Sequence, residues 1–152
     1  MKLAKAFAAS SLFLLLAASG LHAACSTASV AGRFGFTTTG SIPAVGPVAA
    51  TGIFAQDASG NITGAQTRSL NGSVADETFT GTATVNSDCT GTDTVQVFQD
   101  GSLVRTTTLH VVYDDNGREA RAIFTSLVLP NGVSLASIIT IEARKLFSRE
   151  AD

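Results

Sequence analysis

Residues 79–99, FTGTATVNSDCTGTDTVQVFQ, constrain the fold more than any other part of the chain. In the first half of this stretch, Phe79, Gly81, Ala83 and Val85 alternate with threonines. A period of two is typical of a half-buried β-strand. The same unit, a threonine-rich alternating run followed by a Gly, Asn or Asp turn, recurs along the chain. The pattern therefore predicts an all-β domain built from hairpins.

Turn residues divide the chain into eight predicted strands, preceded by a short helical turn at residues 26–31. The strands are predicted at residues 33–40, 48–55, 62–70, 77–85, 91–99, 103–114, 118–129 and 133–147. No segment has a sustained helical period, and closure of a sheet removes its exposed edges. We therefore expect an up-and-down antiparallel β-barrel of about eight strands, with a two-sheet β-sandwich as the alternative.

The N-terminal residues have a different character. Lys2 and Lys5 precede a short apolar run, which is followed by small residues. This pattern predicts a secretory signal peptide at residues 1–24, a single barrel domain at 25–147 and a C-terminal tail at 148–152. We expect a secreted or periplasmic protein without a transmembrane segment, because no run reaches the ~20 apolar residues of a membrane helix.

Cys25 and Cys89 are the two cysteines of the chain. Two cysteines in an exported protein predict one disulfide, which would join the new N-terminus to the turn between two central strands. The alternative is a lipoprotein anchored through Cys25, because residues 22–25 resemble a lipobox. Cys89 would then be a free, buried thiol.

Composition excludes two classes of site. The basic residues are few and scattered, and the chain has a net charge of −2. We therefore expect no nucleic-acid partner. With two cysteines and a single histidine, His110, after the signal peptide, no metal site is expected. Nor does the sequence contain a phosphate-binding loop, and we expect no cofactor.

Two-residue turns also predict the register of the last four strands. The turns used are Asp100-Gly101, Asn116-Gly117 and Asn131-Gly132. The predicted partners are Thr94 with Thr107 and Gln96 with Arg105 at the first turn, Tyr113 with Ala120, Leu109 with Phe124 and Thr107 with Ser126 at the second, and Phe124 with Ile139 and Ser126 with Ser137 at the third.

These registers divide the side chains between two faces. The predicted outer face carries Asp93 and His110, and it places Arg121 opposite Glu142 and Glu119 opposite Arg144, which favours solvent exposure. The same face also holds an apolar band, from which we expect a homo-oligomer; the alternative is that these residues are ordinary strand formers. The band comprises Val95, Val97, Val104, Val112, Ile123, Leu127, Leu129 and Ile138.

The predicted interior face is largely apolar, including Phe98, but it carries several polar side chains. An Asn71-Gly72 turn places Gln66 opposite Glu77, with Arg68 diagonal to it. Arg68 and Arg105 could orient an anionic or carbonyl group of a ligand, and Glu77 is the candidate for proton transfer. The alternative is a purely structural network. The candidate ligand-binding residues are Gln66, Arg68, Gln96, Arg105, Thr107, Tyr113, Phe124 and Ser126.

Four sequence motifs resemble those of a group of small exported bacterial proteins of unassigned function. The motifs are Arg33-Phe-Gly-Phe36, Asp57-Ala-Ser-Gly60, Leu70-Asn-Gly72 and the Gly81-Thr-Ala-Thr-Val85 run with its following Asp88-Cys-Thr-Gly-Thr92. We associate that group with the barrel of allene oxide cyclase and dirigent proteins. The resemblance implies an eight-stranded barrel, often trimeric, with a hydrophobic cavity. No catalytic residue of the cyclase matches a position here, so no enzymatic assignment carries over.

Three functions are compatible with these features. The favoured one is a non-enzymatic exported barrel that binds a small apolar or amphipathic molecule, because the sequence offers no nucleophile–base pair. The second is a cofactor-independent isomerase or cyclase that uses Glu77 as its acid–base group. The third is an envelope or matrix protein with a solidly filled barrel.

Overall fold

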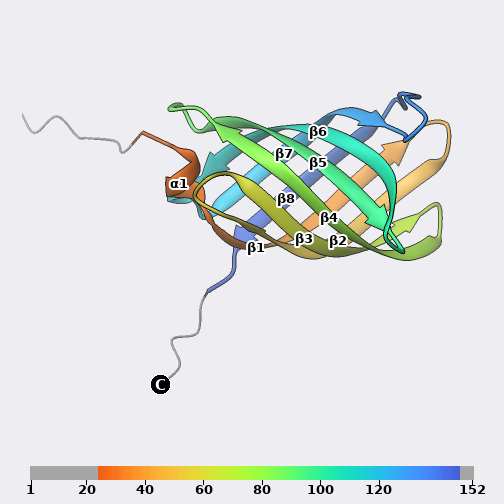
Figure 1. Cartoon of the computed structure of the whole chain (residues 1–152), viewed down its shortest axis with the longest axis horizontal. Helices are drawn as coiled ribbons and strands as arrows, with labels where there is room; N and C mark the ends of the chain where they lie inside the picture. The colour runs from red at the N-terminus through yellow and green to blue at the C-terminus, as the bar shows by residue number, and fades with distance from the viewer. Residues whose placement is uncertain (1–23, 148–152) are drawn as a thin grey trace, which may run out of the picture.

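The computed structural model describes residues 24–147, which form a closed eight-stranded antiparallel barrel (Figure 1). Consecutive strands are neighbours, and β8 closes the barrel against β1. The predicted barrel is confirmed, and the sandwich alternative is wrong. The elements are α1 (Thr27–Val30), β1 (Gly32–Ile42), β2 (Gly46–Gln56), β3 (Asn61–Leu70), β4 (Ser73–Val85), β5 (Thr90–Gln99), β6 (Ser102–Asp114), the 3-10 turn η1 (Asp115–Gly117), β7 (Glu119–Val128) and β8 (Ile138–Lys145).

The predicted boundaries differ from the structure mainly in the last strand. β8 begins at Ile138, five residues later than expected, because the chain after Pro130 forms an irregular connection with a single bridge to Val128. The Asn-Gly turn between β3 and β4 behaves as predicted. Asn71 and Gly72 both have positive φ, 49° and 85°, as a type I′ turn requires. The signal peptide and the C-terminal tail lie outside the described residues, apart from Ala24.

One end of the barrel is closed by the short helix α1, at the left of Figure 1. Ser26 and Ser29 form a capping box that starts this helix, which satisfies backbone groups that would otherwise lack partners. Val30, the last residue of α1, and Phe34, near the start of β1, are almost completely buried, with 1% and 0% exposure. Phe34 stacks on Phe54 at a ring separation of 4.9 Å. This end is therefore filled by side chains.

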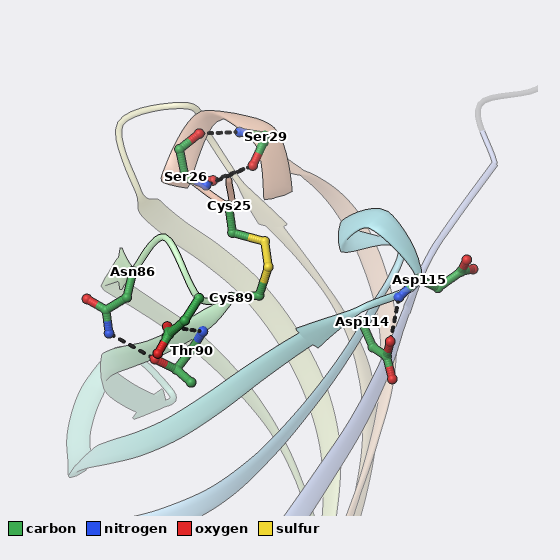
Figure 2. The surroundings of a disulfide bond; sticks show 9 residues. Cys25, Ser26, Ser29, Asn86, Cys89, Thr90, Asp114 and Asp115 are labelled. Atoms are coloured by element: carbon green, nitrogen blue, oxygen red, sulfur yellow. Dashed lines mark hydrogen bonds between the residues drawn. A yellow bond between two sulfur atoms is a disulfide. The ribbon is translucent and has the colours of Figure 1, made fainter. Parts of the chain in front are cut away.

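A disulfide joins Cys25 to Cys89 at the same end (Figure 2). It links the segment before α1 to the turn between β4 and β5, as predicted. The two cysteines are 64 positions apart, and a loop of this size corresponds to about 4 kcal/mol of stabilisation in the chain-entropy account. Because the sulfur of Cys25 is bonded to Cys89, it is not free for lipidation, and the alternative with a free Cys89 does not agree with the structure.

Two β-bulges overturn part of the predicted register. Between β5 and β6 the pairing slips at Val97 and Phe98, where Val104 is the extra residue. Between β6 and β7 it slips at Thr108 and Leu109. The predicted pairs Tyr113–Ala120 and Leu109–Phe124 are confirmed. Beyond the bulges, however, Thr94 pairs with Thr108, Gln96 with Thr106, and Ser126 with Thr108.

The β7–β8 register is as predicted along the strand-paired segment, and this segment ends at Ile123 and Thr140. The expected pairs Phe124–Ile139 and Ser126–Ser137 lie beyond it. Arg144 forms the expected ion pair with Glu119, at 2.7 Å. Arg121 lies opposite Glu142 but binds Asp114 instead.

The first bulge also exchanges the two faces of β5. A one-residue slip turns every side chain to the opposite face. Phe98 and Gln96, predicted inside, leave the interior. Together with the second bulge, which changes the register of β7 beyond Phe124, this places five of the eight residues of the predicted outer apolar band in the interior. These five are Val95, Val97, Val104, Leu127 and Leu129. Only Val112, Ile123 and Ile138 of that band are strongly exposed, so the expected oligomer surface loses most of its basis and stays a prediction.

Candidate ligand-binding cavity

The interior of the barrel contains a cavity of about 390 Å³, which lies within the size range of small-molecule sites. It opens at the end opposite α1, where the β1–β2 turn contributes Val45, a residue that is 41% exposed. Its walls are mostly apolar. The larger apolar side chains that line it are Phe36, Ile42, Val48, Phe54, Ile62, Leu70, Phe79, Val95, Val97, Val104, Leu109, Phe124, Leu127, Leu129, Leu135, Ile139 and Ile141.

Small inward-facing residues shape the wall beside this cavity. At Gly64, a Cβ would lie only 2.6 Å from a ring carbon of Phe79, so the absence of a side chain lets this ring lie across β3. Phe79 in turn contacts Phe36 edge-on, with 5.9 Å between ring centroids. The aromatic rings are thereby held against the wall and border the cavity.

Glu77 is the centre of a charged cluster on one side of the cavity. Its carboxylate accepts hydrogen bonds from Gln66 Nε2 at 2.7 Å, from Arg68 Nε at 2.7 Å, and from Arg105 Nη1 and Nη2 at 2.8 and 2.7 Å. The Glu77 side chain has no exposed area, while those of Arg68 and Arg105 are 14% and 15% exposed. We call these four residues the Glu77 cluster. With two guanidinium groups and one carboxylate, it has a net charge of +1.

The arginines decide the ionisation state of Glu77. Burial alone would raise the pKa of its carboxyl, but the hydrogen bonds and charge of Arg105, together with Arg68 and Gln66, lower it to about 2. Glu77 therefore stays ionised at neutral pH. A carboxylate with so low a pKa is a poor general base, because proton transfer is most effective near the working pH.

One buried hydrogen-bond donor of the Glu77 cluster has no acceptor among the described residues. Arg68 Nη1 is buried, lines the cavity region and has no hydrogen-bond partner among residues 24–147. Buried polar atoms are usually paired, and an unpaired one costs about 1–3 kcal/mol. Arg68 can therefore donate a hydrogen bond to a molecule that enters the cavity.

Asp93 is a second carboxyl of the interior; it is half-buried, and its surroundings are quite different. It lies three residues after the start of β5, near the closed end, between Ala83 of β4 and Leu109 of β6. It lines the cavity, and its Oδ1 atom is buried without a hydrogen-bond partner among the described residues. Burial raises the pKa of the Asp93 carboxyl to about 7.

The structure brings together six of the nine predicted site residues. Glu77, Gln66, Arg68, Arg105, Thr107 and Phe124 all line the cavity. Tyr113 is buried at the closed end, where its hydroxyl donates to Gln56 Oε1 at 3.1 Å, and it does not line the cavity. Gln96 is exposed and Ser126 is half-buried outside the cavity lining; both placements correct the prediction.

Asp93 is the polar residue that the sequence reasoning missed, because the predicted register placed it on the outer face. A usable signal was present. Val95 and Val97 alternate with Thr94 and Gln96 in this strand. Asp93 lies on the same face as the two valines, which is the apolar face that points inward.

No family model and no curated protein matches the chain. Among solved structures, it is similar to a redesigned β-barrel, mFAP1, whose structure contains bound DFHBI. The TM-score is 0.52, the identity is 15%, and the match covers 76% of this chain and 94% of the other. At this identity the similarity supports the barrel fold alone.

Neither a membrane-spanning helix nor a metal-binding group of side chains is present among the described residues. No helix among residues 24–147 is long and apolar enough to cross a membrane. Within the same range, no group of three or more His, Cys, Asp or Glu side chains is arranged to hold a metal ion.

Proposed function

We propose that this protein binds a small, largely apolar molecule inside its barrel. The observation that carries the proposal is a cavity with apolar walls that is lined by Arg68, whose buried Nη1 atom has no hydrogen-bond partner among residues 24–147. Apolar walls with a few placed polar groups are how small-molecule sites are built. The ligand would place an acceptor group, such as a carbonyl or an anionic oxygen, against Arg68.

The similar redesigned barrel supports the proposal at the level of architecture. It was solved with DFHBI bound, so a barrel of this general architecture can accommodate a small organic molecule. The resemblance to the allene oxide cyclase and dirigent barrel agrees with a hydrophobic cavity, and it remains part of this proposal.

The alternative of an isomerase or cyclase lacks support at its proposed acid–base group. Glu77 is held by two arginines and its pKa is lowered to about 2. The third hypothesis requires a solidly filled barrel, which disagrees with a cavity of about 390 Å³.

We also propose that the protein is exported to an oxidising compartment, secreted or periplasmic. The Cys25–Cys89 disulfide supports this proposal, because such bonds persist mainly outside the cytosol. The predicted signal peptide at residues 1–24 is its other basis. Sequencing the N-terminus of protein isolated from its own cells would test it: a first residue close to Cys25 supports export, and an intact Met1 contradicts it.

The binding function can be tested with neighbouring alanines of β2. Ala50 lines the cavity opposite Arg68, whereas Ala49 is exposed on the outside of the barrel. We expect saturable binding of an anilinonaphthalene sulfonate dye to the natural protein, measured by fluorescence. Ala50→Leu should weaken it about tenfold by filling the cavity, and Ala49→Leu should leave it unchanged. Thermal unfolding verifies that both variants fold. Equal effects of the two substitutions, or no saturable binding, would contradict the proposal.

A further inference from the structure

Two residues that line the same cavity each carry a buried polar atom without a hydrogen-bond partner among the described residues. One is the donor Arg68 Nη1 in the Glu77 cluster, and the other is the acceptor Asp93 Oδ1 near the closed end. Arg105 of the cluster lies opposite Val97, which is four residues after Asp93 on β5. At ~3.3 Å per residue, the two polar regions are about 13 Å apart along the strand. Apolar side chains occupy the wall between them.

Building on the proposed function, we propose that the ligand carries a cationic amine at its inner end, which binds the carboxylate of Asp93. The Glu77 cluster lies towards the open end, where Arg68 would bind the acceptor group of the same ligand. The ligand class is therefore an apolar amine, with a chain or ring system between its polar ends.

The charge distribution favours an amine at the closed end over an anion or a carbonyl. The nearest arginines of the interior, Arg68 and Arg105, are both engaged with Glu77. Burial is the cause of the altered pKa of Asp93, with no compensating cation. An ammonium group would supply that cation and donate to Oδ1. Charge-assisted hydrogen bonds of this kind are among the strongest in proteins.

The residues around Asp93 indicate that the pH dependence of amine binding arises from this one carboxyl. β4 presents Ala83 to it, and β6 presents Leu109 and, further along, Tyr113. Burial raises the pKa of Tyr113, which is hydrogen-bonded to Gln56, so this phenol stays neutral throughout the physiological range. His110 is on the outer face. Between pH 5 and 8, the titrating group that faces the inner end of the cavity is therefore Asp93.

The test uses three probes with the same chain: decylamine, decanol and decanoate. Their binding to the full folded protein is measured by calorimetry or by dye displacement at pH 5 and pH 8. We expect decylamine to bind about tenfold more tightly than decanol at pH 8, and this advantage to shrink to about threefold or less at pH 5 as Asp93 becomes neutral. The amine itself stays protonated, since its pKa is close to that of lysine.

Two variants with the same change of charge identify the residue responsible. Asp93→Asn should remove the advantage of decylamine over decanol at pH 8 and its pH dependence. Asp100→Asn is the matched control, because Asp100 is exposed in the β5–β6 turn and does not line the cavity. This variant should behave as the natural protein. If Asp93→Asn fails to fold, the pH dependence of the natural protein still decides the question.

The outcomes separate the two proposals. Binding of decanol or decanoate without an amine preference at pH 8 would overturn this inference and leave the proposed function standing. An amine preference that survives Asp93→Asn would also overturn it. If none of the three probes binds and the dye does not bind either, both proposals fail.

Discussion

Glu77 and Asp93 lie on neighbouring strands, in two regions of the same barrel interior. Glu77 is buried, and Asp93 is half-buried with a buried Oδ1 atom. Glu77 accepts four hydrogen bonds, three of them from arginines, and its pKa is lowered to about 2. Asp93 has apolar neighbours, an unpartnered oxygen and a pKa raised to about 7. Loss of solvation raises the pKa of both carboxyls, so the difference in ionisation arises from the partners. We infer that Glu77 supports the wall, while Asp93 is available to a ligand.

The strongest test of this difference is removal of the charge on Glu77. Glu77→Gln keeps the shape of the side chain but leaves two partly buried guanidinium groups without their carboxylate. We expect the free energy of unfolding to fall by about 3–5 kcal/mol at pH 7, measured by denaturant unfolding. Glu142→Gln is the control, because Glu142 is exposed on the outer face. A loss below about 1 kcal/mol would show that the cluster does not hold the wall together.

The loss of unfolding free energy caused by Glu77→Gln should depend on pH in a definite direction. Because the folded pKa of Glu77 is lowered from 4.5 to about 2, its contribution is complete above pH 4.5 and disappears as the pH falls towards 2. The difference in unfolding free energy between the natural protein and Glu77→Gln should therefore shrink over this range. A constant difference down to pH 2 would contradict the lowered pKa.

Asp93→Asn should have the opposite effect. The rise in its pKa from 3.8 to about 7 means that the folded protein holds a proton that the unfolded chain has lost, so stability decreases as the pH rises through this range. Removing the carboxyl should raise the free energy of unfolding by roughly 2–3 kcal/mol at pH 8, and by almost nothing at pH 4. Denaturant unfolding at both values, with Asp100→Asn as control, measures this. Destabilisation at pH 8 would contradict the account.

The smallest expected effect compares the two arginines of the Glu77 cluster. Arg105 donates two hydrogen bonds to Glu77 and Arg68 donates one. Lysine preserves the charge but not the paired geometry. Arg105→Lys should therefore cost about 2 kcal/mol of unfolding free energy, and Arg68→Lys about 1 kcal/mol. A larger loss for Arg68→Lys would show that its Nη1 atom has a structural partner after all.

The sequence was sufficient for the architecture because local signals repeat. Alternating threonine-rich runs and positive-φ turns such as Asn71-Gly72 define hairpins, and eight strands joined in series in this way favour closure. The Glu77 cluster was partly predictable for the same reason. The Asn71-Gly72 turn fixes the register that brings Gln66 and Arg68 to Glu77.

The second half of the site could not be placed in this way, because a turn fixes register only up to the next bulge. The extra residue Val104 in β6 shifts the β5–β6 pairing, and the prediction consequently exchanged Asp93 with Thr94 and Val97 with Gln96. No turn residue signals a bulge. The alternation within β5 alone predicts the correct inward face. The prediction was wrong because it extended the register of the Asp100-Gly101 turn beyond the bulge.

The most direct test of the account is a pH titration of the Glu77 and Asp93 side-chain carboxyl signals by carbon-13 NMR of the folded protein. We expect Glu77 to remain ionised down to about pH 2 and Asp93 to titrate near pH 7. Addition of decylamine should lower the midpoint of Asp93 and leave that of Glu77 unchanged. Titration of both carboxyls near their ordinary values of about 4 would contradict the central claim that one is satisfied by the protein and the other is left for a ligand.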